Sequence, residues 1–506
     1  MKKKILKNTF FCGLSTIIIS IIGFFLLPFM VFHLGIEKYG LIAIFSILSI
    51  SGYISLFELG LQGAITRFIA QYKAQGDPQS IVNVFKFFLG LFFLIGILLV
   101  IIGFTLKIFF IHLFHVPMAD IQVFSKVLTL VFYSYSFIFP SIVYIGLFVG
   151  LQKYGFLKIT EIITFIIYAL CVVVALNSGK GFEYVVYANL LCLLLRFICY
   201  VVGSFFVLPK IANNIMNFDK IKEVLKMAKY LFTIKIAGFI YHNLPRFSVA
   251  ICLGPIFLAS YEIAVKIPRV LKTVSGVINS VIMPVASELS TRKDVDRLKK
   301  LFVRGVKYQI FFLMPVVFTG ILFAKEILHL WMSEKYIGLA PLLQIMFVWN
   351  LLVAIVTYNN SIMNGMNKKM DKMALWAWLT TGVSTVITFG FINHFKLYAV
   401  VVGYCAGILV WIPFIAVYTC KEIGVSKIQI FGLFYRGCKY MLFGGVVLVL
   451  LKSLFFSFQA PLTLVSMGLS FLLFFVLMYE CYLDKKERVE LISLIKRYPI
   501  KDKVKR

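Results

Sequence analysis

The sequence predicts an all-α polytopic membrane protein with about fourteen transmembrane helices. Of its 506 residues, 61% are hydrophobic and 14% are charged, and the mean hydropathy is +0.96. Uncharged runs such as 87–106, 127–152, 397–420 and 453–479 are each long enough to cross a hydrocarbon core of roughly 30 Å as a helix. These runs do not alternate polar and apolar residues at every second position, as the strands of a transmembrane barrel do. Helices are therefore the predicted spanning elements.

Taken in order, the apolar segments and the basic loops between them predict the topology. With the span limits given below, the N-terminal segment and every second loop together hold 34 Lys and Arg residues, whereas the intervening loops hold 4. By the positive-inside rule, both termini are predicted to be cytoplasmic. The apolar stretch after the basic N-terminus continues to Phe32 without an A-x-A site, so we expect an uncleaved first span. The fourteen predicted spans cover residues 9–32, 41–66, 85–109, 122–150, 156–177, 183–207, 230–253, 256–287, 308–328, 340–363, 373–393, 397–419, 437–457 and 460–482.

A faint internal repeat divides these spans into two halves. A Leu-Gly dipeptide closes the first span at Gly35 and the seventh at Gly254, and the basic exits near Lys73 and Arg292 have the same separation along the chain. Transporters are commonly built from such repeats, with the substrate site between them. The predicted division is an N-terminal six-helix lobe at 1–208, a cytoplasmic linker at 209–229, a C-terminal six-helix lobe at 230–420, two additional helices at 421–483 and a basic tail at 484–506.

The formal net charge of +30 is distributed over alternate loops, which argues against nucleic acid as a partner. In the tail at 484–506, apolar residues at 491, 492, 494 and 495 are mixed with nine basic residues. We expect this tail to lie on anionic inner-leaflet lipids as an amphipathic helix, and a disordered basic tail is the alternative. The nine cysteines contain no C-x-x-C pair, so neither a disulfide framework nor a metal site is predicted.

Charged residues inside predicted spans seven and eight are the principal functional signal. In the seventh span, Lys235, His242 and Arg246 are spaced at i, i+7 and i+11, which places them on one face of a helix. Each intramembrane charge costs roughly 2.5 to 3.5 kcal/mol, and such residues usually face a bundle interior or a hydrated cavity. Arg246 is predicted to lie too deep to reach either headgroup layer. Lys235 lies nearer the surface, and snorkelling is the alternative for it.

The eighth span repeats this pattern on a second helix. Glu262, Lys266 and Arg269 are spaced at i, i+4 and i+7, so they form one polar stripe on an otherwise apolar helix. The two stripes together predict a hydrated cavity that is net cationic. A Glu262–Lys266 pair that neutralises itself at i, i+4 is the alternative to ligand contact.

Two prolines stand directly beside the two arginines of these spans. Pro245 precedes Arg246 and Pro268 precedes Arg269. Proline removes a backbone donor and clashes with the preceding turn, so each is predicted to break or kink its helix. Because the outer turn at Gly254 is short, the two helices should move together, and the prolines are predicted to form a bendable gate.

Three further charges lie in or next to predicted spans. Glu58 lies within the second span and is predicted to face the cavity or to be ion-paired. Arg67 lies further along the same span, near the cytoplasmic end, and an interfacial anchor is its alternative role. Arg196 lies near the middle of the sixth span. We expect it to face the cavity, with pairing to a neighbouring acid such as Glu161 as the alternative.

Two segments of the first half carry a family resemblance. The first reads L-G-I-E-K-Y-G-L from Leu34, and the second reads F-E-L-G-L-Q-G-A-I-T-R-F-I-A over 57–70. A first helix ending in L-G-x-x-x-Y-G, an acidic-L-G-L segment and an Arg at the inner end of the second helix resemble polysaccharide flippases of the Wzx type. These belong to the multidrug/oligosaccharidyl-lipid/polysaccharide (MOP) exporter superfamily. Glu58 replaces the Asp of the family pattern, which keeps the charge but lengthens the side chain.

The resemblance extends to the span count, the termini, the repeat and the cationic seventh and eighth helices. It implies a V-shaped bundle of two lobes that moves undecaprenyl-diphosphate-linked oligosaccharide across the bacterial plasma membrane by alternating access, for O-antigen, capsule or similar polysaccharides. No cofactor is expected, and polysaccharide polymerase and chain-length proteins are expected partners. In this interpretation the cavity cations that bind the diphosphate by hydrogen bonds and charge are Arg246, Arg269, Lys266, Arg196, Lys235 and His242.

Two other functions are weaker predictions. A multidrug cation antiporter of the same superfamily needs acidic groups, whereas the deep cations outnumber the deep acids by five to three. A membrane polymerase or ligase generally presents a large outer loop, but every predicted outer loop is short. The sequence contains no Walker A, H-E-x-x-H or G-x-S-x-G motif, so no enzyme activity is predicted.

Overall fold

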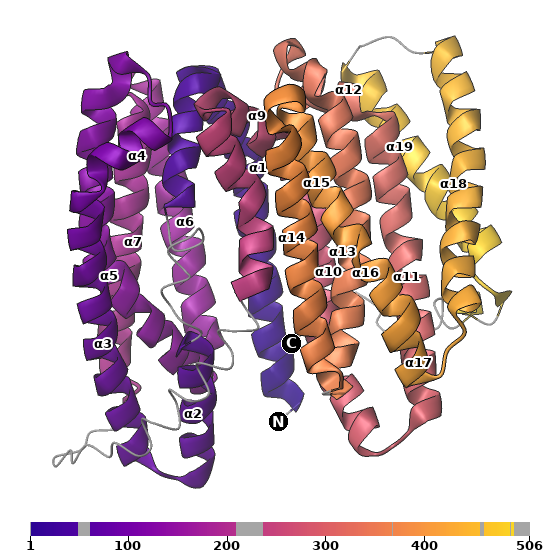
Figure 1. Ribbon diagram of the computed structural model, residues 1–506, viewed down its shortest axis with the longest axis horizontal. Helices are drawn as coiled ribbons and strands as arrows, with labels where there is room; N and C mark the ends of the chain where they lie inside the picture. The colour runs from indigo at the N-terminus through magenta and orange to yellow at the C-terminus, as the bar shows by residue number, and fades with distance from the viewer. Residues whose placement is uncertain are drawn as a thin grey trace, which may run out of the picture. The chain divides into compact units, whose positions relative to one another are not determined.

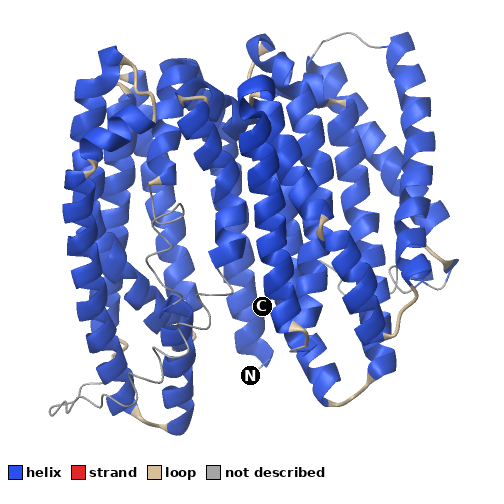
Figure 2. Ribbon diagram, in the orientation of Figure 1, coloured by secondary structure: helices blue, strands red, loops and turns tan. Residues whose placement is uncertain are grey.

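The structure is a computed structural model that describes residues 2–48, 61–208, 236–366, 368–455, 460–485 and 487–489. Within these ranges every regular element is helical, as Figure 2 shows. Ten helices in the described part of the chain are long and apolar enough to cross a membrane. The chain is thus an all-helical polytopic membrane protein, as predicted. The predicted linker at 209–229, most of the tail and parts of predicted spans two and seven lie outside the described residues.

Contacts along the chain define two compact units. The first unit contains residues 1–267 and 377–407, and the second contains 268–376 and 408–506. The helices of the first unit, labelled in Figure 1, are α1 (Lys2–Ile47), α2 (Leu61–Gln75), α3 (Pro78–Thr105), α4 (Lys107–Leu113), α5 (Ile121–Gly150), α6 (Tyr154–Asn177), α7 (Phe182–Phe205), a helix over 236–252, α9 (Pro255–Lys266), and most of α14 (Met370–Phe395) and α15 (Leu397–Leu409).

The second unit contains the remaining helices of the described chain. These are α10 (Arg269–Thr291), α11 (Val295–Leu322), α12 (Ala324–Trp331), α13 (Ala340–Met366), α16 (Trp411–Phe414), α17 (Cys420–Ile423), α18 (Lys427–Phe455) and α19 (Ala460–Leu477). A π-helical turn over Ile415–Thr419 joins α16 to α17, and another over Met478–Tyr482 follows α19. α11 and α18 begin at Val295 and Lys427, several turns before the span starts predicted at 308 and 437.

Two glycines with the same unusual backbone conformation interrupt the chain where the Leu-Gly dipeptides occur. Gly35 lies inside α1 with φ 78° and ψ 165°, and Gly254 precedes α9 with φ 83° and ψ −175°. This region of backbone space is open essentially to glycine alone, because a Cβ would clash there. The first predicted span therefore ends at Gly35, and the helical segment 36–47 after it corresponds to α9 in the repeat.

Other local features recur at nearly the same separation as the two glycines. Asp77 and Asp294 are both N-caps, and each accepts a hydrogen bond from the backbone N–H three residues later, at 3.0 Å from Ser80 and 3.1 Å from Arg297. Each cap begins a helix of 28 residues, α3 or α11, and each is followed by a short helix, α4 or α12. Residues with positive φ recur in the same way, as the pairs Gly76 and Lys293, His115 and Ser333, Gln152 and Lys369, and Gly179 and Lys396 show.

Close backbone approaches hold the first unit together. α1 packs along α9, where Gly40 lies against the carbonyl of Pro255, so any side chain at position 40 would clash with that backbone. The buried Tyr135 of α5 donates a 2.7 Å hydrogen bond to the carbonyl of Leu48 at the end of the first long helix. A buried hydroxyl needs such a partner in an apolar interior. The packing of α1 on α9 positions the helix that carries Glu262 and Lys266 of predicted span eight.

In the second unit, α10 and α13 are packed along their length. Asn279 of α10 donates a 3.0 Å hydrogen bond to Thr357 of α13. Gln309 of α11 lies at 3.4 Å from Ser275 and 3.5 Å from Asn279, which brings the third helix into the same polar contact. Polar side chains that share hydrogen bonds stabilise helix pairs in membranes, where the hydrophobic effect cannot distinguish protein from lipid.

Candidate functional site

The deepest charged residue of predicted span seven forms an ion pair with span eight. The guanidinium of Arg246 meets the carboxylate of Glu262 in a fork, with Nε 2.5 Å from Oε1 and Nη2 donating to Oε2 at 2.9 Å. The two side chains are 19% and 10% exposed, so the pair is largely withdrawn from its surroundings. A hydrogen bond between two charged groups is roughly twice as strong as one between neutral groups. The pair links the helix over 236–252 to α9.

Glu262 has an ion-pair partner that the sequence spacing did not suggest. The i, i+4 spacing pointed to Lys266 on its own helix, and the structure shows a fork with Arg246 of the preceding helix. Spacing along a single helix could not indicate this pair, because the pair forms across two helices. Glu262 is thus ion-paired, and Arg246 holds a carboxylate in this structure.

Lys266 is the last residue of α9 and its ammonium reaches α1. Its Nζ lies 3.3 Å from the position that a Cβ on Gly23 would occupy. The absence of a side chain at Gly23 therefore leaves the room that the ammonium uses. We did not predict a role for Gly23, although a glycine in the middle of a long apolar helix is a signal for close approach.

His242 is held by two tyrosines. Its Nδ1 lies 3.0 Å from the hydroxyl of Tyr404 on α15, and Tyr241 donates a 2.7 Å hydrogen bond to the Tyr404 carbonyl. The rings of Tyr241 and Tyr404 lie with their centroids 4.6 Å apart. Tyr404 was not predicted as a site residue, because a single Tyr in an apolar span gives no periodic signal. The arrangement orients the imidazole, which is otherwise exposed.

Arg196 on α7 is oriented by a threonine and not by an acid. Its Nε and Nη2 both donate to Thr164 Oγ1 on α6, at 3.1 and 2.9 Å. The alternative partner Glu161 instead accepts hydrogen bonds from Lys158 at 2.8 Å and from Ser15 at 3.4 Å. Because Thr164 is neutral, the positive charge of the half-buried Arg196 is not cancelled by it.

The two prolines have different surroundings. The helix over 236–252 continues without a break through the buried Pro245. A single missing N–H removes one hydrogen bond, and the neighbouring turns keep the helix intact. At Pro268 the break is present, because α9 ends at Lys266 and α10 begins at Arg269.

The remaining predicted residues are less informative. Arg269 is half-buried at the first position of α10, and Arg67 is exposed on α2. Lys235 and Glu58 lie outside the described residues. The structure therefore brings together Arg246 with Glu262 and places Lys266 on the same short helix as that carboxylate.

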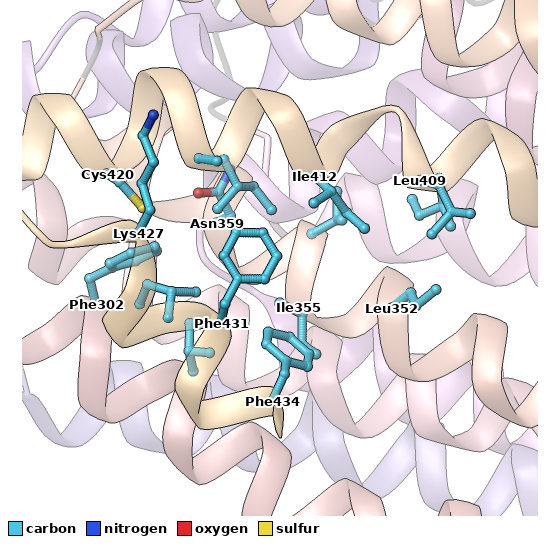
Figure 3. Close-up of a pocket in the computed structure, with 16 residues that line it drawn as sticks. Phe302, Leu352, Ile355, Asn359, Leu409, Ile412, Cys420, Lys427, Phe431 and Phe434 are labelled. Carbon is cyan, nitrogen blue, oxygen red and sulfur yellow. The ribbon is translucent and has the colours of Figure 1, made fainter. Parts of the chain in front are cut away.

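The second unit contains a separate, apolar cavity of about 190 Å³. Figure 3 shows it between the segment containing Leu409, Ile412 and Cys420 and the start of α18, with Lys427 at the opposite end from Leu352 and Leu409. Its lining is almost wholly hydrocarbon, including Phe431. Such a cavity fits an alkyl chain and offers little to a sugar or a phosphate.

Comparison with known proteins finds similarity in both the sequence and the fold. A family model described as polysaccharide biosynthesis protein matches residues 5–290. The structure of the lipid II flippase MurJ in an inward closed conformation is similar with a TM-score of 0.71, at 15% identity over 95% of this chain and 99% of that one. No curated protein matches the sequence.

Two further solved structures have the same fold. An inward-facing multidrug resistance MATE transporter of the MOP superfamily matches with a TM-score of 0.65, at 14% identity over 84% of this chain and 94% of that one. A MOP superfamily transporter from Pyrococcus furiosus, described as having a binding pocket of reverse polarity, matches with a TM-score of 0.59, at 14% identity over 87% and 96% of the two chains. At such identities the likeness shows the fold alone.

Proposed function

Since this chain belongs to the family of polysaccharide biosynthesis proteins and has the fold of MOP transporters, we propose that it is a flippase for lipid-linked oligosaccharide. In this proposal it moves undecaprenyl-diphosphate-linked oligosaccharide across the bacterial plasma membrane by alternating access, with both termini cytoplasmic. The comparison with a protein described as a lipid II flippase supports a lipid-linked substrate.

The proposed architecture has fourteen spans, arranged as two six-helix lobes at 1–208 and 230–420 followed by two additional helices. The recurrence of positive-φ residues supports the two-lobe repeat, since unrelated halves are not expected to share five such positions at nearly constant separation along the chain. The matched caps Asp77 and Asp294 support it independently.

The observation that carries the proposal is the cationic character of the deep polar residues in the described part of the chain. Arg196 is held by a neutral threonine, and Lys266 and Arg269 lie on either side of the break at Pro268. A diphosphate is a doubly anionic ligand that guanidinium and ammonium groups bind well. Cationic drugs would be repelled by the same groups, which is why we rank the multidrug antiporter second.

The Arg246–Glu262 fork adds a step to this proposal. In this structure the carboxylate holds the guanidinium, so an arriving diphosphate would have to compete with Glu262 for Arg246. A ligand can shift a conformational equilibrium only by its differential affinity for the two states. Release of Glu262 on binding would provide such a difference and would couple headgroup capture to movement of α9.

The test is reconstitution of the purified chain in liposomes that contain undecaprenyl-diphosphate-linked oligosaccharide in both leaflets. A flippase should make the inner pool accessible to an external sugar-cleaving enzyme, whereas protein-free liposomes should protect half of the lipid. Uptake of a cationic dye in place of glycolipid movement would establish the antiporter instead. Absence of glycolipid movement under every imposed ion gradient and potential would contradict the flippase.

A further inference from the structure

A second cavity, which is polar, lies at the start of α18, and none of its lining residues belongs to predicted spans seven and eight. It has a volume of about 470 Å³ and lies within the second unit. Its walls come from the N-terminal half of α11, from the turn before α18 and the first turns of that helix, and from the segment after the π-helical turn that follows α19. On α18 the lining residues are Gln429, Leu433 and Arg436, which follow one helix face.

The cavity is strongly positive. Five cationic and two anionic side chains line it, a net charge of +3, and these residues are Lys299, Lys300, Arg304, Lys307, Arg436, Asp484 and Glu487. Lys307 is 5% exposed and its Nζ contacts Asp484 Oδ2 at 3.0 Å and Glu487 Oε2 at 2.6 Å. The lining as a whole is therefore cationic and includes this buried ion pair.

The buried Lys307 has a structural role in this cavity. Glu487 is 7% exposed, and its Oε2 also accepts the backbone N–H of Asp484 at 3.0 Å. The ring centroid of Tyr482 lies 5.7 Å from the same ammonium. These contacts tie the segment after α19 to α11 and so build one wall. One wall of the cavity thus contains the buried ion pair of Lys307 and Glu487. The lining as a whole carries a net positive charge, which favours binding of an anion.

The position of the cavity indicates the source of the anion. Next to the lining residues of α18, the side chains of Ile428, Phe431 and Tyr435 are 83%, 51% and 71% exposed. These side chains lie in the first turns of α18, just before the predicted span at 437–457, where exposed apolar and aromatic groups fit the membrane interface. By the loop charges, the residues that line the cavity are on the cytoplasmic side. Basic pockets between transmembrane helices at this level fit the phosphate-bearing headgroups of anionic lipids.

We propose that this cavity, lined by Lys299, Lys300, Arg304 and Arg436, binds the phosphate headgroup of an anionic inner-leaflet lipid. The bound lipid holds α11 and α18 together by neutralising the repulsion between their cations. The site is distinct from the substrate residues of spans seven and eight, and the inference stands whether or not the chain is a flippase.

The experiment uses the full purified chain in a neutral detergent, titrated with phosphatidylglycerol and followed by native mass spectrometry and thermal unfolding. The test variant carries Lys300→Gln, Arg304→Gln and Arg436→Gln. Its matched control carries Arg292→Gln, Lys293→Gln and Lys421→Gln, which remove the same charge from exposed basic residues that do not line the cavity. Lys299 is left in place because its stem packs on Gly424.

We expect the unmodified chain and the control variant to retain phosphatidylglycerol and to gain thermal stability from it. The test variant should bind it roughly a hundredfold more weakly, because each cation near an anionic lipid contributes about fivefold. If the triple variant does not fold, Arg436→Gln alone should weaken binding about fivefold. Equal loss in test and control variants, or equal binding of phosphatidylcholine, would overturn the site. Displacement of the lipid by equimolar glycerol phosphate or inorganic phosphate would overturn the lipid as its ligand.

Discussion

The Arg246–Glu262 fork makes a sharp prediction about single residues. Removing one partner leaves a charge in a site where the side chains are mostly buried, and such changes typically destabilise a protein by about 3–5 kcal/mol. We therefore expect Arg246→Ala to lower the free energy of unfolding by this order. The double variant Arg246→Met/Glu262→Leu should recover most of the loss, since it leaves no unpaired charge. Denaturant unfolding in detergent measures both. Additive losses in the double variant would show that the two groups do not interact.

The contact between Lys266 and Gly23 predicts a change in function with little change in stability. A methyl group at position 23 would meet the ammonium at 3.3 Å and displace it. We expect Gly23→Ala to reduce glycolipid movement severalfold while changing the unfolding free energy by less than about 1 kcal/mol. Gly13→Ala is the matched control, because that glycine lies on the same helix with no atom within 4 Å of the added carbon. Equal activity of the two variants would remove Lys266 from the mechanism.

At the residue scale, charged residues could be identified from the sequence but their partners could not. Arg196, Arg246, Lys266 and Glu262 are conspicuous because charges are rare in apolar helices. Their neighbours Thr164, Gly23 and Tyr404 are ordinary residues of membrane spans, and they become significant only through the packing of one helix on another. Periodicity along a single helix carries no information about such crossings.

Among the elements, the break between α9 and α10 is the place where we expect movement. Pro268 lies in this break, whereas Pro245 lies inside a continuous helix. Pro268→Ala should favour one continuous helix and slow glycolipid movement severalfold, without weakening binding of the lipid-linked oligosaccharide. Pro245→Ala should leave the rate of movement nearly unchanged. Transport and binding assays on the same preparations separate these effects. Loss of binding in Pro268→Ala would assign this residue to the site and not to a gate.

The matched caps predict matched stability losses. Asp77→Ala and Asp294→Ala each remove an N-cap hydrogen bond and should each lower the unfolding free energy by about 1 kcal/mol. Asp120→Ala is the control, because Asp120 precedes α5 without capping it through its side chain. Thermal unfolding of the three variants is the measurement. A loss in the control equal to that of the caps would attribute the effect to charge and not to capping.

The sequence predicted most of the described long helices closely but placed two starts too late. α11 and α18 begin several turns before the predicted spans, because their first turns carry lysines and arginines that hydropathy assigns to loops. The lysines and arginines of these turns line the basic cavity. The same charged residues lowered the hydropathy and so obscured the helix starts in the sequence. The short helices α4 and α12 were missed because each is too short to give a periodic signal.

For the whole molecule, the loop charges predict the orientation in the membrane. A fluorescent reporter fused after Arg506 should be active in the cytoplasm, and a cysteine introduced at Leu253 should react with a membrane-impermeant reagent from outside. A cysteine introduced at Lys293 is the control, since it should react only after the membrane is opened. The opposite labelling pattern would contradict the predicted topology. Composition and hydropathy sufficed for the helical class, and the sequence motifs sufficed for the family of polysaccharide biosynthesis proteins.

The Arg246–Glu262 fork also bears on how the chain is made. During synthesis the helix over 236–252 leaves the ribosome before α9, so Arg246 arrives at the membrane before its carboxylate exists. An unpaired arginine at the helix centre costs roughly 2.5 to 3.5 kcal/mol on insertion, and pairing removes much of that penalty. We therefore expect the two helices to integrate as one hairpin, with the first held at the insertion machinery until Glu262 has emerged. In nascent chains truncated soon after Gly254, a cysteine introduced at Leu253 should stay shielded from a membrane-impermeant reagent applied outside, and in chains extended through α9 it should react.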